Sequence, residues 1–278
     1  MKKPIKWLGG KTWLATKTSM LINQVKPKQV FEPFAGSGAF SFFHEFENVT
    51  LNDSNPALIN FYSQLAKGYE INPNDFYLDK DFYELIKLRL NQSILSGVEL
   101  GEIEAGYFWY LCMHSYNGLV RQNKKGLFNM PMGQYKGLAT PPDTKQFLRV
   151  ARNWSFNCGC FSKIDLSDAN LVLIDPPYED GKKKVFRGYT DDPNENLQAR
   201  ILEKISSING VIMATNTFTP ELAAIYRQHE FKVFKTMVKR SVSCKGNGRH
   251  KVPEMVAFRG LSNNQLKLLI DQFEPVWV

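Results

Sequence analysis

Cysteine is scarce in this chain, which has four cysteines among its 278 residues. Small domains that rely on disulfides are far richer in cysteine, so we expect no disulfide framework. Cys158 and Cys160 flank a single glycine, whereas zinc-binding pairs usually have two residues between them. Because His229 and His250 are not at ligand spacing from this pair, we expect structural thiols and no metal site.

The sequence also lacks an uninterrupted apolar run long enough to span a membrane. Residues 1–4 are basic, but they lead into a Trp-Leu-Gly-Gly segment and not into the apolar core of a signal peptide. We therefore expect a cytoplasmic protein that needs no membrane. Nothing in the sequence indicates an obligate protein partner, and a monomer or a weak dimer is expected.

Positive charge is in excess, with 35 lysines and arginines against 27 acidic residues. A solvated basic surface is common, but this charge gathers at residues 124–125, 182–187 and 235–251, in segments typical of loops or strand ends. Such segments can reach a phosphate backbone, so the charge favours a nucleic-acid partner.

Short apolar runs followed by turn residues predict the main strands, at residues 29–31, 49–51, 171–174 and 211–214. Continuous apolar runs suit a parallel sheet that is covered on both faces. Helix-like stretches alternate with these runs, for example at 56–67 and 196–208. The alternation predicts an α/β fold.

The C-terminal part adds a different pattern. Two further strands are expected at 231–241 and 254–260, joined by a glycine-rich connection at 243–248. A last helix is expected at 262–273, with Ser262 as its N-cap. This pattern predicts an antiparallel strand pair followed by a helix that covers the sheet.

A candidate catalytic turn follows the third apolar run and consists of Asp175, Pro176, Pro177 and Tyr178. Ligands of open α/β sheets bind beyond the carboxyl ends of the strands, where this turn lies. Asp175 and the carbonyl of Pro176 can accept hydrogen bonds from an exocyclic amine, and Tyr178 offers a flat face to a flipped base. A tight strand-to-helix turn without a catalytic role is the structural alternative.

A loop of small residues follows the first apolar run and consists of Phe34, Ala35, Gly36, Ser37 and Gly38. Its glycines let the backbone approach a nucleoside closely. The loop lacks the third glycine of the dinucleotide fingerprint and the Gly-Lys-Ser/Thr of a P-loop, which disfavours NAD and ATP. Taken alone, a simple tight connection explains it equally well.

Three single residues complete the candidates from the residues themselves. Asp53, at the end of the second apolar run, is placed to bind ribose hydroxyls or to cap the next helix. Trp7 can pack on an adenine or on a methionyl tail, or belong to the core. Lys11 can pair with the carboxylate of a ligand that has such a methionyl tail.

In this order, the Lys-Trp-x-Gly-Gly-Lys segment at 6–11, the Glu-Pro-Phe-x-Gly-x-Gly loop at 32–38 and the turn at 175–178 resemble the Dam-type, class D12, family of DNA adenine-N6 methyltransferases. The resemblance runs from Lys6 to about Val256. It implies a Rossmann-like methyltransferase sheet that uses S-adenosylmethionine, in a protein of prokaryotic or phage origin.

The resemblance also implies two domains and a role for each candidate residue. Residues 1–61 and 143–278 form the catalytic domain, and residues 62–142 form an inserted target-recognition domain, mostly helical with a β-hairpin. Trp7, Lys11, Asp53, Asp175 and the loop 34–38 contact S-adenosylmethionine, while the turn 175–178 holds the target adenine. The residues implied to bind double-stranded DNA are Lys6, Tyr116, Asn117, Leu119, Arg121, Asn123, Asn129, Pro131, Gln134, Tyr135 and Arg249.

The chain departs from the family at one recognition position. Family members that recognise GATC carry Arg at the position of Gln134, and the loss of this charge weakens the case for GATC. The family resemblance still implies a short target, either GATC or a related site. The lysine-rich loop at 179–190 also differs from those members, although Phe186 and Tyr189 fit its aromatic positions.

Three alternatives stay open at this point. They are cytosine-N4 methylation, which is associated with Ser in place of Asp175, methylation of RNA or of protein amides, which is associated with Asn there, and a DNA-binding regulator with a degenerate core. The mechanism expected for the leading hypothesis is direct transfer of the methyl group to N6, with no metal and no covalent intermediate, driven by positioning and electrostatics.

Overall fold

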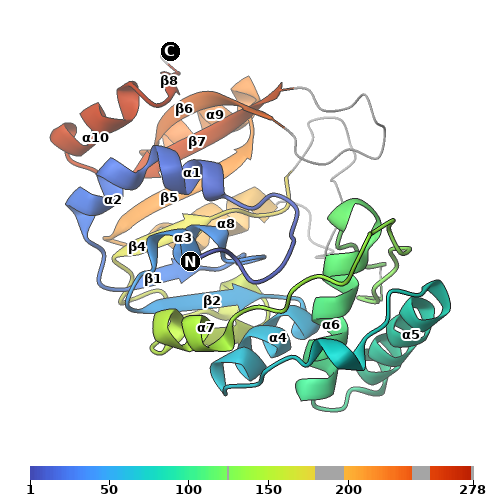
Figure 1. The fold of residues 1–278 in the computed structure, drawn as a ribbon. Helices are drawn as coiled ribbons and strands as arrows, with labels where there is room; N and C mark the ends of the chain where they lie inside the picture. Colours follow the sequence, from blue (N-terminus) through green and yellow to red (C-terminus); the bar gives the residue numbers. More distant parts are fainter. Residues whose placement is uncertain (124, 179–196, 240–250, 277–278) are drawn as a thin grey trace.

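The computed structural model describes residues 1–123, 125–178, 197–239 and 251–276. These residues build one eight-stranded mixed sheet with the strand order β3-β2-β1-β4-β5-β7-β6-β8 (Figure 1). The strands are β1 (Val30–Glu32), β2 (Val49–Asp53), β3 (Ser155–Cys158), β4 (Leu171–Ile174), β5 (Val211–Thr217), β6 (Lys232–Lys239), β7 (Lys251–Arg259) and β8 (Glu274–Pro275). The first five strands pair in parallel, whereas β7 pairs antiparallel with both β5 and β6.

Helices cover both faces of this sheet (Figure 1). Side chains of α1, α2 and α3 share a core with Leu171, Leu173 and Val256 on one face, and α8 and α9 pack against Val172 and Ile212 on the other. The helices outside the segment 62–142 are α1 (Thr12–Lys17), α2 (Ser19–Val25), α3 (Ala39–His44), α4 (Pro56–Ala66), which ends just inside it, α7 (Thr144–Ala151), α8 (Leu197–Ile205), α9 (Pro220–Gln228) and α10 (Asn263–Ile270). A 3-10 turn, η3, spans Phe161–Lys163.

The strand order reverses beside β1, since β2 lies on one side of it and β4 on the other. Where the connections after two adjacent parallel strands run to opposite sides of the sheet, a crevice opens at the carboxyl ends of those strands. Open α/β sheets bind their ligands in this crevice. The loop 34–38 follows β1, Asp53 ends β2 and Asp175 follows β4. The topology therefore brings three of the predicted segments to one edge.

The predicted α/β fold is confirmed, with the four predicted parallel strands at β1, β2, β4 and β5 and the antiparallel pair at β6 and β7. Two strands were missed. β3 is an edge strand with mostly exposed side chains, so it has no apolar run, and β8 has only two residues. Ser262 caps the last helix as predicted, and its hydroxyl accepts the amide of Gln265.

The segment 62–142 contributes two long helices, α5 (Lys80–Ser96) and α6 (Glu102–His114), with short 3-10 turns η1 (Pro73–Asp75) and η2 (Tyr116–Gly118). Asp79 begins α5 by accepting the amide of Phe82, and Glu104 reaches back to the amide of Gly101 at the start of α6. Phe108 and Trp109 of α6 belong to the same apolar core as the sheet. The predicted mostly helical character is thus present, while the domain boundaries stay a prediction.

The expected β-hairpin is looser than predicted. Between His114 and Tyr135 the described residues form two isolated antiparallel bridges, Ser115 with Met132 and Gln122 with Phe128. Asn117 lies between the two bridges in a left-handed conformation, with φ 54°, which interrupts the extended backbone there. Pro131 has no amide hydrogen to donate across the hairpin. Regular pairing is therefore broken, although backbone hydrogen bonds still cross between the two arms.

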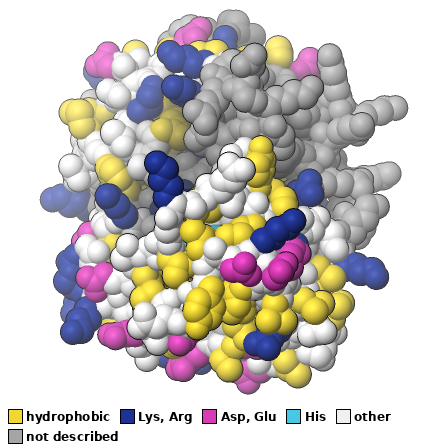
Figure 2. All heavy atoms as spheres, turned by 45° about the vertical axis from the view of Figure 1, so that its right-hand side comes forward, with side chains coloured by type: hydrophobic (Ala, Val, Ile, Leu, Met, Phe, Trp, Pro, Cys, Tyr) yellow, Lys and Arg dark blue, Asp and Glu magenta, His cyan; other side chains and the backbone are white. Residues whose placement is uncertain are grey.

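Apolar side chains are exposed on the outer part of this segment, interspersed with charged ones (Figure 2). The exposed large apolar residues there are Tyr77, Leu85, Leu88, Leu95, Val98 and Ile103.

Among the residues described, no helix combines the length and the apolar character needed to cross a membrane. The cytoplasmic location stays a prediction.

Candidate active site

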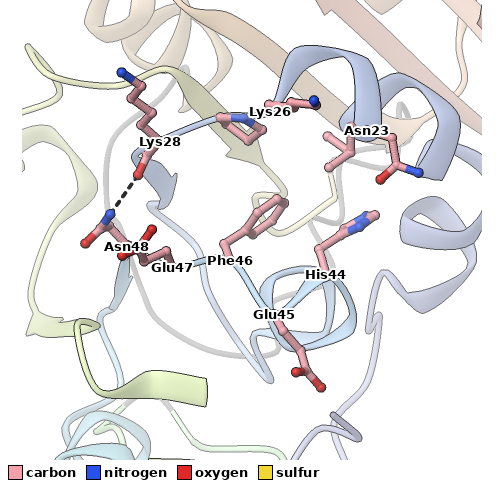
Figure 3. A pocket seen from close by; sticks show the side chains of 10 residues that line it. Asn23, Lys26, Lys28, His44, Glu45, Phe46, Glu47 and Asn48 are labelled. Atoms are coloured by element: carbon pink, nitrogen blue, oxygen red, sulfur yellow. Dashed lines mark hydrogen bonds between the residues drawn. The ribbon is translucent and has the colours of Figure 1, made fainter. Parts of the chain in front are cut away.

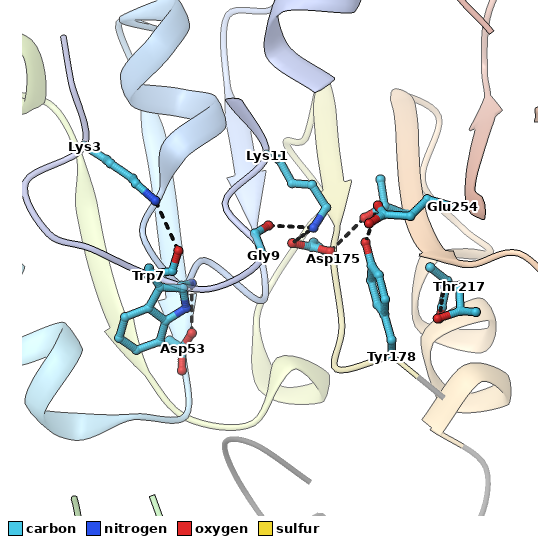
Figure 4. A network of polar contacts seen from close by, with 12 residues as sticks. Lys3, Trp7, Gly9, Lys11, Asp53, Asp175, Tyr178, Thr217 and Glu254 are labelled. Atoms are coloured by element: carbon cyan, nitrogen blue, oxygen red, sulfur yellow. Dashed lines mark hydrogen bonds and ion pairs between the residues drawn. The ribbon is translucent and has the colours of Figure 1, made fainter. Parts of the chain in front are cut away.

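Asp175 stands at the centre of a polar network at the carboxyl edge of the sheet (Figure 4). The ammonium of Lys11 lies 2.8 Å from Oδ2 of Asp175, and the Thr215 hydroxyl donates to Oδ1 at 2.8 Å. Lys11 also donates to the Gly9 carbonyl at 2.7 Å. Both carboxylate oxygens thus have one partner, and each keeps a second lone pair for a ligand.

Lys11 is held between the two predicted sites. Its side chain is only 4% exposed, and its ammonium lies 5.1 Å from the centre of the Tyr178 ring. An ammonium this deeply buried needs charged and polar partners, which Asp175 and Gly9 supply. Lys11, which was expected to pair with the donor's carboxylate, therefore lies against the carboxylate of Asp175 in this structure.

Tyr178 is fixed at its hydroxyl end. The hydroxyl donates to Oε2 of Glu254 on β7 at 2.9 Å. Burial raises the pKa of Tyr178 well above its usual value, and the nearby charges of Asp175 and Glu254 raise it further. The tyrosine therefore remains a neutral hydrogen-bond donor at any ordinary pH.

Gly36 lets Trp7 approach the loop that follows β1. The glycine has φ +49°, and a Cβ there would lie 2.6 Å from Nε1 of Trp7. The Tyr62 hydroxyl donates to the Gly36 carbonyl at 3.3 Å. A side chain at this position would collide with the indole, so the loop needs glycine both for its conformation and for this contact.

Asp53 fastens the same loop to β2. Its Oδ2 accepts the amide of Gly36 at 2.9 Å, and its Oδ1 accepts the amide of Asn55 at 3.0 Å. Burial raises the pKa of Asp53, while these hydrogen bonds lower it. The remaining lone pairs are available to ribose hydroxyls, the role predicted for this residue.

Glu32 lies behind the loop and supports the helix that follows it. Helix α3 begins after Gly38, which has no side chain to cap it. Oε1 of Glu32 accepts the amide of Ser41 at 3.0 Å and its hydroxyl at 2.5 Å. Burial raises the pKa of Glu32 to about 7, against the lowering effect of the Ser41 bonds.

Three other residues of the loop lie in different surroundings. The Ser37 side chain is 2% exposed, and its hydroxyl has no hydrogen-bond partner among the residues described. Phe34 packs against Phe161, with 5.0 Å between ring centres. Ala35 is buried, and its amide donates to the Asn52 carbonyl. An unpaired buried hydroxyl is costly in the absence of a ligand, so Ser37 fits a group that hydrogen-bonds there.

The predicted DNA-binding residues at 116–135 lie together, and the most exposed of them form one surface. Tyr116, Asn117, Arg121, Pro131 and Gln134 are exposed. Nε of Arg121 donates to Oδ1 of Asn129 at 3.0 Å. This bond holds the guanidinium while leaving its terminal amino groups on the exposed side.

The remaining predicted residues of this segment mainly support its shape. Oδ1 of Asn123 accepts the amides of Lys125 and Leu127, and Leu119 packs partly against the core. The Tyr135 hydroxyl donates to the Ser115 carbonyl at 2.7 Å. The side chains of Asn123 and Tyr135 are bonded to the backbone and Leu119 packs on the core, so these three residues form the frame of the surface.

Lys6 connects this frame to the N-terminal segment that carries Trp7. Its ammonium donates to the Met113 carbonyl at 3.0 Å and lies 4.5 Å from the Tyr135 ring centre, and its stem packs on Gly118. Burial lowers the pKa of Lys6. Because Trp7 follows it directly, Lys6 ties the predicted recognition segment to the predicted donor pocket.

Several predicted features lie outside the described residues. They are Arg249, the loop 179–190 with Phe186 and Tyr189, and the glycine-rich connection 243–248. Their roles stay predictions.

Sequence reasoning missed four residues that complete the site, namely Thr215, Glu254, Glu32 and Phe161. Thr215 and Glu254 each carried a detectable signal, because Thr215 directly follows the apolar run of β5 and Glu254 directly precedes that of β7, both near the ligand-binding edge. Phe161 followed no strand that the sequence could identify, so it had none.

A surface cavity of about 640 Å³ lies away from this network (Figure 3). It is lined by residues 22, 23, 26–28 and 44–48, which precede β1 and β2 and therefore mark the opposite edge of the sheet. Burial lowers the pKa of His44 to about 4, so this histidine is neutral at ordinary pH. None of the predicted site residues lines this cavity.

Comparison with known proteins agrees with this geometry. A family model described as "D12 class N6 adenine-specific DNA methyltransferase" matches residues 7–242. The retron Ec67 DNA adenine methylase of Escherichia coli is 30% identical over 268 residues, covering 94% of this chain and 92% of that protein. The DNA adenine methylase of Haemophilus influenzae is 32% identical over 278 residues, covering 92% and 93%. That of Vibrio cholerae is 30% identical over 273 residues, covering 91% and 94%.

The family match includes the loop 34–38, the segment 116–135 and the turn 175–178. The chain belongs to the D12 class of N6 adenine-specific DNA methyltransferases.

Proposed function

We propose that this protein transfers a methyl group from S-adenosylmethionine to N6 of an adenine flipped out of double-stranded DNA. The observation that carries the proposal is the 2.8 Å contact between Lys11 and Asp175. It joins the segment that begins at Lys6 and Trp7 to the turn that is expected to hold the target base. Membership of the family favours adenine N6 over cytosine N4 and over RNA.

The residues after β1 and β2 fit the methyl donor. Gly36 lets the Trp7 indole lie against the loop, Asp53 keeps lone-pair capacity for ribose hydroxyls, and Ser37 has a buried hydroxyl to donate or accept. When bound, S-adenosylmethionine supplies an electrophilic methyl group on its sulfonium. The chain's own part is to hold that group still and to exclude water around it.

The catalytic turn fits the acceptor. Asp175 and the Pro176 carbonyl accept the two N6 protons, which turns the nitrogen lone pair away from the ring, and Tyr178 stacks on the base. Positive charge develops on N6 as it is methylated, and the carboxylate of Asp175 stabilises it. Asp175 can accept the N6 proton while it keeps its bonds to Lys11 and Thr215, because each of these residues occupies only one lone pair of one carboxylate oxygen.

The exposed part of the segment 116–135 is proposed to read the DNA sequence. Arg121 presents its terminal amino groups to a guanine edge, and Asn117 suits an adenine edge. Gln134 is exposed and uncharged where GATC-recognising members carry Arg, which weakens the case for GATC itself. The proposed target is a short site, either GATC or a related sequence. Lys6 acts from behind this surface.

A labelled-methyl assay tests the proposal. DNA from a host without adenine methylation is incubated with the protein and S-adenosylmethionine that carries a tritiated methyl group. Tritium in N6-methyladenine after digestion supports the function. Tritium in N4-methylcytosine, or label found only in an RNA substrate, would overturn it.

A further inference from the structure

We propose that Glu254 is a positioning residue that holds Tyr178 in place for the target adenine. The inference deepens the proposed function and rests on it. The Tyr178 hydroxyl donates to Oε2 of Glu254 at 2.9 Å (Figure 4). A stacking ring has two angles to control, and this bond fixes the end of the ring that is farthest from the backbone.

Glu254 is a firm anchor because of its place in the sheet. It lies on β7, where it pairs with Thr217 of β5 on one side and with Thr236 of β6 on the other. A residue whose backbone is paired on both sides has little freedom to move. The bond to Tyr178 therefore reaches one of the better-supported positions of the fold.

Glu254 and the catalytic carboxylate act on the same face of the sheet. Side chains alternate along a strand, and Val256 and Phe258 of β7 belong to the same core as Leu171 and Leu173 of β4. Glu254 shares the side of Val256, as Asp175 shares that of Leu173. Its carboxylate thus extends from this face to the ring.

Two different strands consequently hold the two ends of the catalytic turn. Thr215 of β5 donates to Asp175, and Glu254 of β7 accepts from Tyr178. Prolines occupy the two positions between and restrict the backbone there. The turn is thereby preorganised, so that the acceptor amine and the stacked base meet groups that do not have to move.

The carboxylate of Glu254 has a second effect on the ring. Its charge and its hydrogen bond keep the Tyr178 hydroxyl protonated and able to donate. Glutamine can accept the same hydrogen bond but carries no charge. Glu254→Gln and Glu254→Ala therefore separate orientation from charge.

The test is a set of steady-state kinetic measurements on Glu254→Gln, Glu254→Ala, Tyr178→Phe and the double variant Glu254→Ala/Tyr178→Phe. We expect kcat to fall about tenfold or more in Glu254→Ala, with a much smaller loss in Glu254→Gln. Donor affinity, measured by calorimetry, is expected to stay within about threefold, because Glu254 acts on the acceptor side. Glu274→Ala removes an exposed carboxylate from the same sheet and serves as the charge control.

The double variant decides the outcome. If Glu254 acts through the Tyr178 hydroxyl, the double variant is about as slow as Tyr178→Phe alone. If the losses in kcat of the two single variants multiply in the double variant, the inference is overturned and the proposed function stays intact. If Glu254→Ala does not fold, Glu254→Gln with Tyr178→Phe completes the same cycle. Failure of the unmodified protein to methylate adenine would overturn both.

Discussion

Lys11 and Asp175 form an ion pair of 2.8 Å that joins the start of the chain to the turn after β4. The pair is largely buried, with side-chain exposures of 4% and 20%. It is anchored on both sides, by Gly9 and by Thr215. Such a pair fixes the distance between the two segments that are proposed to hold donor and acceptor.

Breaking this pair is expected to destabilise the fold as well as to stop transfer. Lys11→Met leaves a poorly compensated carboxylate, and Asp175→Asn leaves a buried ammonium. Each is expected to lower the free energy of unfolding by about 2–3 kcal/mol, and the double variant by less than the sum. Urea denaturation checks this. The control Lys87→Met breaks a more exposed pair with Glu84 and is expected to cost under about 1 kcal/mol. Strict additivity at Lys11 and Asp175 would contradict the coupling.

Gly36→Ala is expected to weaken donor binding because its Cβ would lie 2.6 Å from Trp7. The expected cost is about 2–4 kcal/mol in unfolding free energy and a loss of more than about tenfold in S-adenosylmethionine affinity. Gly97→Ala is the matched control, since Gly97 also has a positive φ but nothing lies within 4 Å of its Cβ position. It is expected to cost about 1 kcal/mol and to leave donor binding unchanged. Equal effects of the two variants would show that the Trp7 contact is unimportant.

Glu32 makes stability depend on pH. Burial raises the pKa of Glu32 in the folded protein to about 7, above its usual value of 4.5, so its contribution to the free energy of unfolding is fully present below pH 4.5 and is lost as the pH rises through 7. Glu32→Gln has no such charge, so the variant is expected to gain about 1–3 kcal/mol relative to the unmodified protein between pH 5 and pH 8. Urea denaturation at several pH values measures this difference.

Glu45 gives the opposite case within the same protein. Its hydrogen bond to the N-terminal amine lowers the pKa of Glu45, so its contribution is present above pH 4.5 and is lost on acidification. Glu45→Gln is therefore expected to show a flat difference between pH 5 and pH 8. A flat difference for Glu32→Gln as well would contradict the role of the buried carboxyl.

Arg121→Ala is expected to relax the recognition of one base and to weaken discrimination there by about 1–3 kcal/mol. Sequencing of modified sites in methylated DNA would reveal additional sequences at one position of the target. Arg149→Ala removes an exposed arginine from α7 and is the control for the change in net charge. An unchanged target in Arg121→Ala would remove this residue from base recognition.

Much of the fold was predictable because its signals are local. The buried strands β1, β2, β4 and β5 appear as apolar runs, and Ser262 marks the start of α10. β3 was missed because an edge strand does not need apolar side chains on both faces. The recognition hairpin was predicted too regular, since left-handed Asn117 breaks the pairing in a way that residue type alone does not determine.

The candidate site likewise contains residues that local sequence signals identify and residues that only long-range contacts bring together. Asp175, Tyr178 and Lys11 belong to short motifs, so their sequence neighbours identify them. Thr215 and Glu254 act through contacts between strands that are remote in sequence, and only the pairing of β5 with β4 and β7 brings them there. The partner of Lys11 depended on the same long-range arrangement, and it proved to be Asp175.

The most direct measurement is the sequencing of modified bases in a host without adenine methylation that expresses this protein. N6-methyladenine is expected at nearly every copy of one short sequence, and at none when Asp175→Ala is expressed at the same level. Methylation of cytosine N4, or N6-methyladenine that persists in Asp175→Ala, would contradict the account.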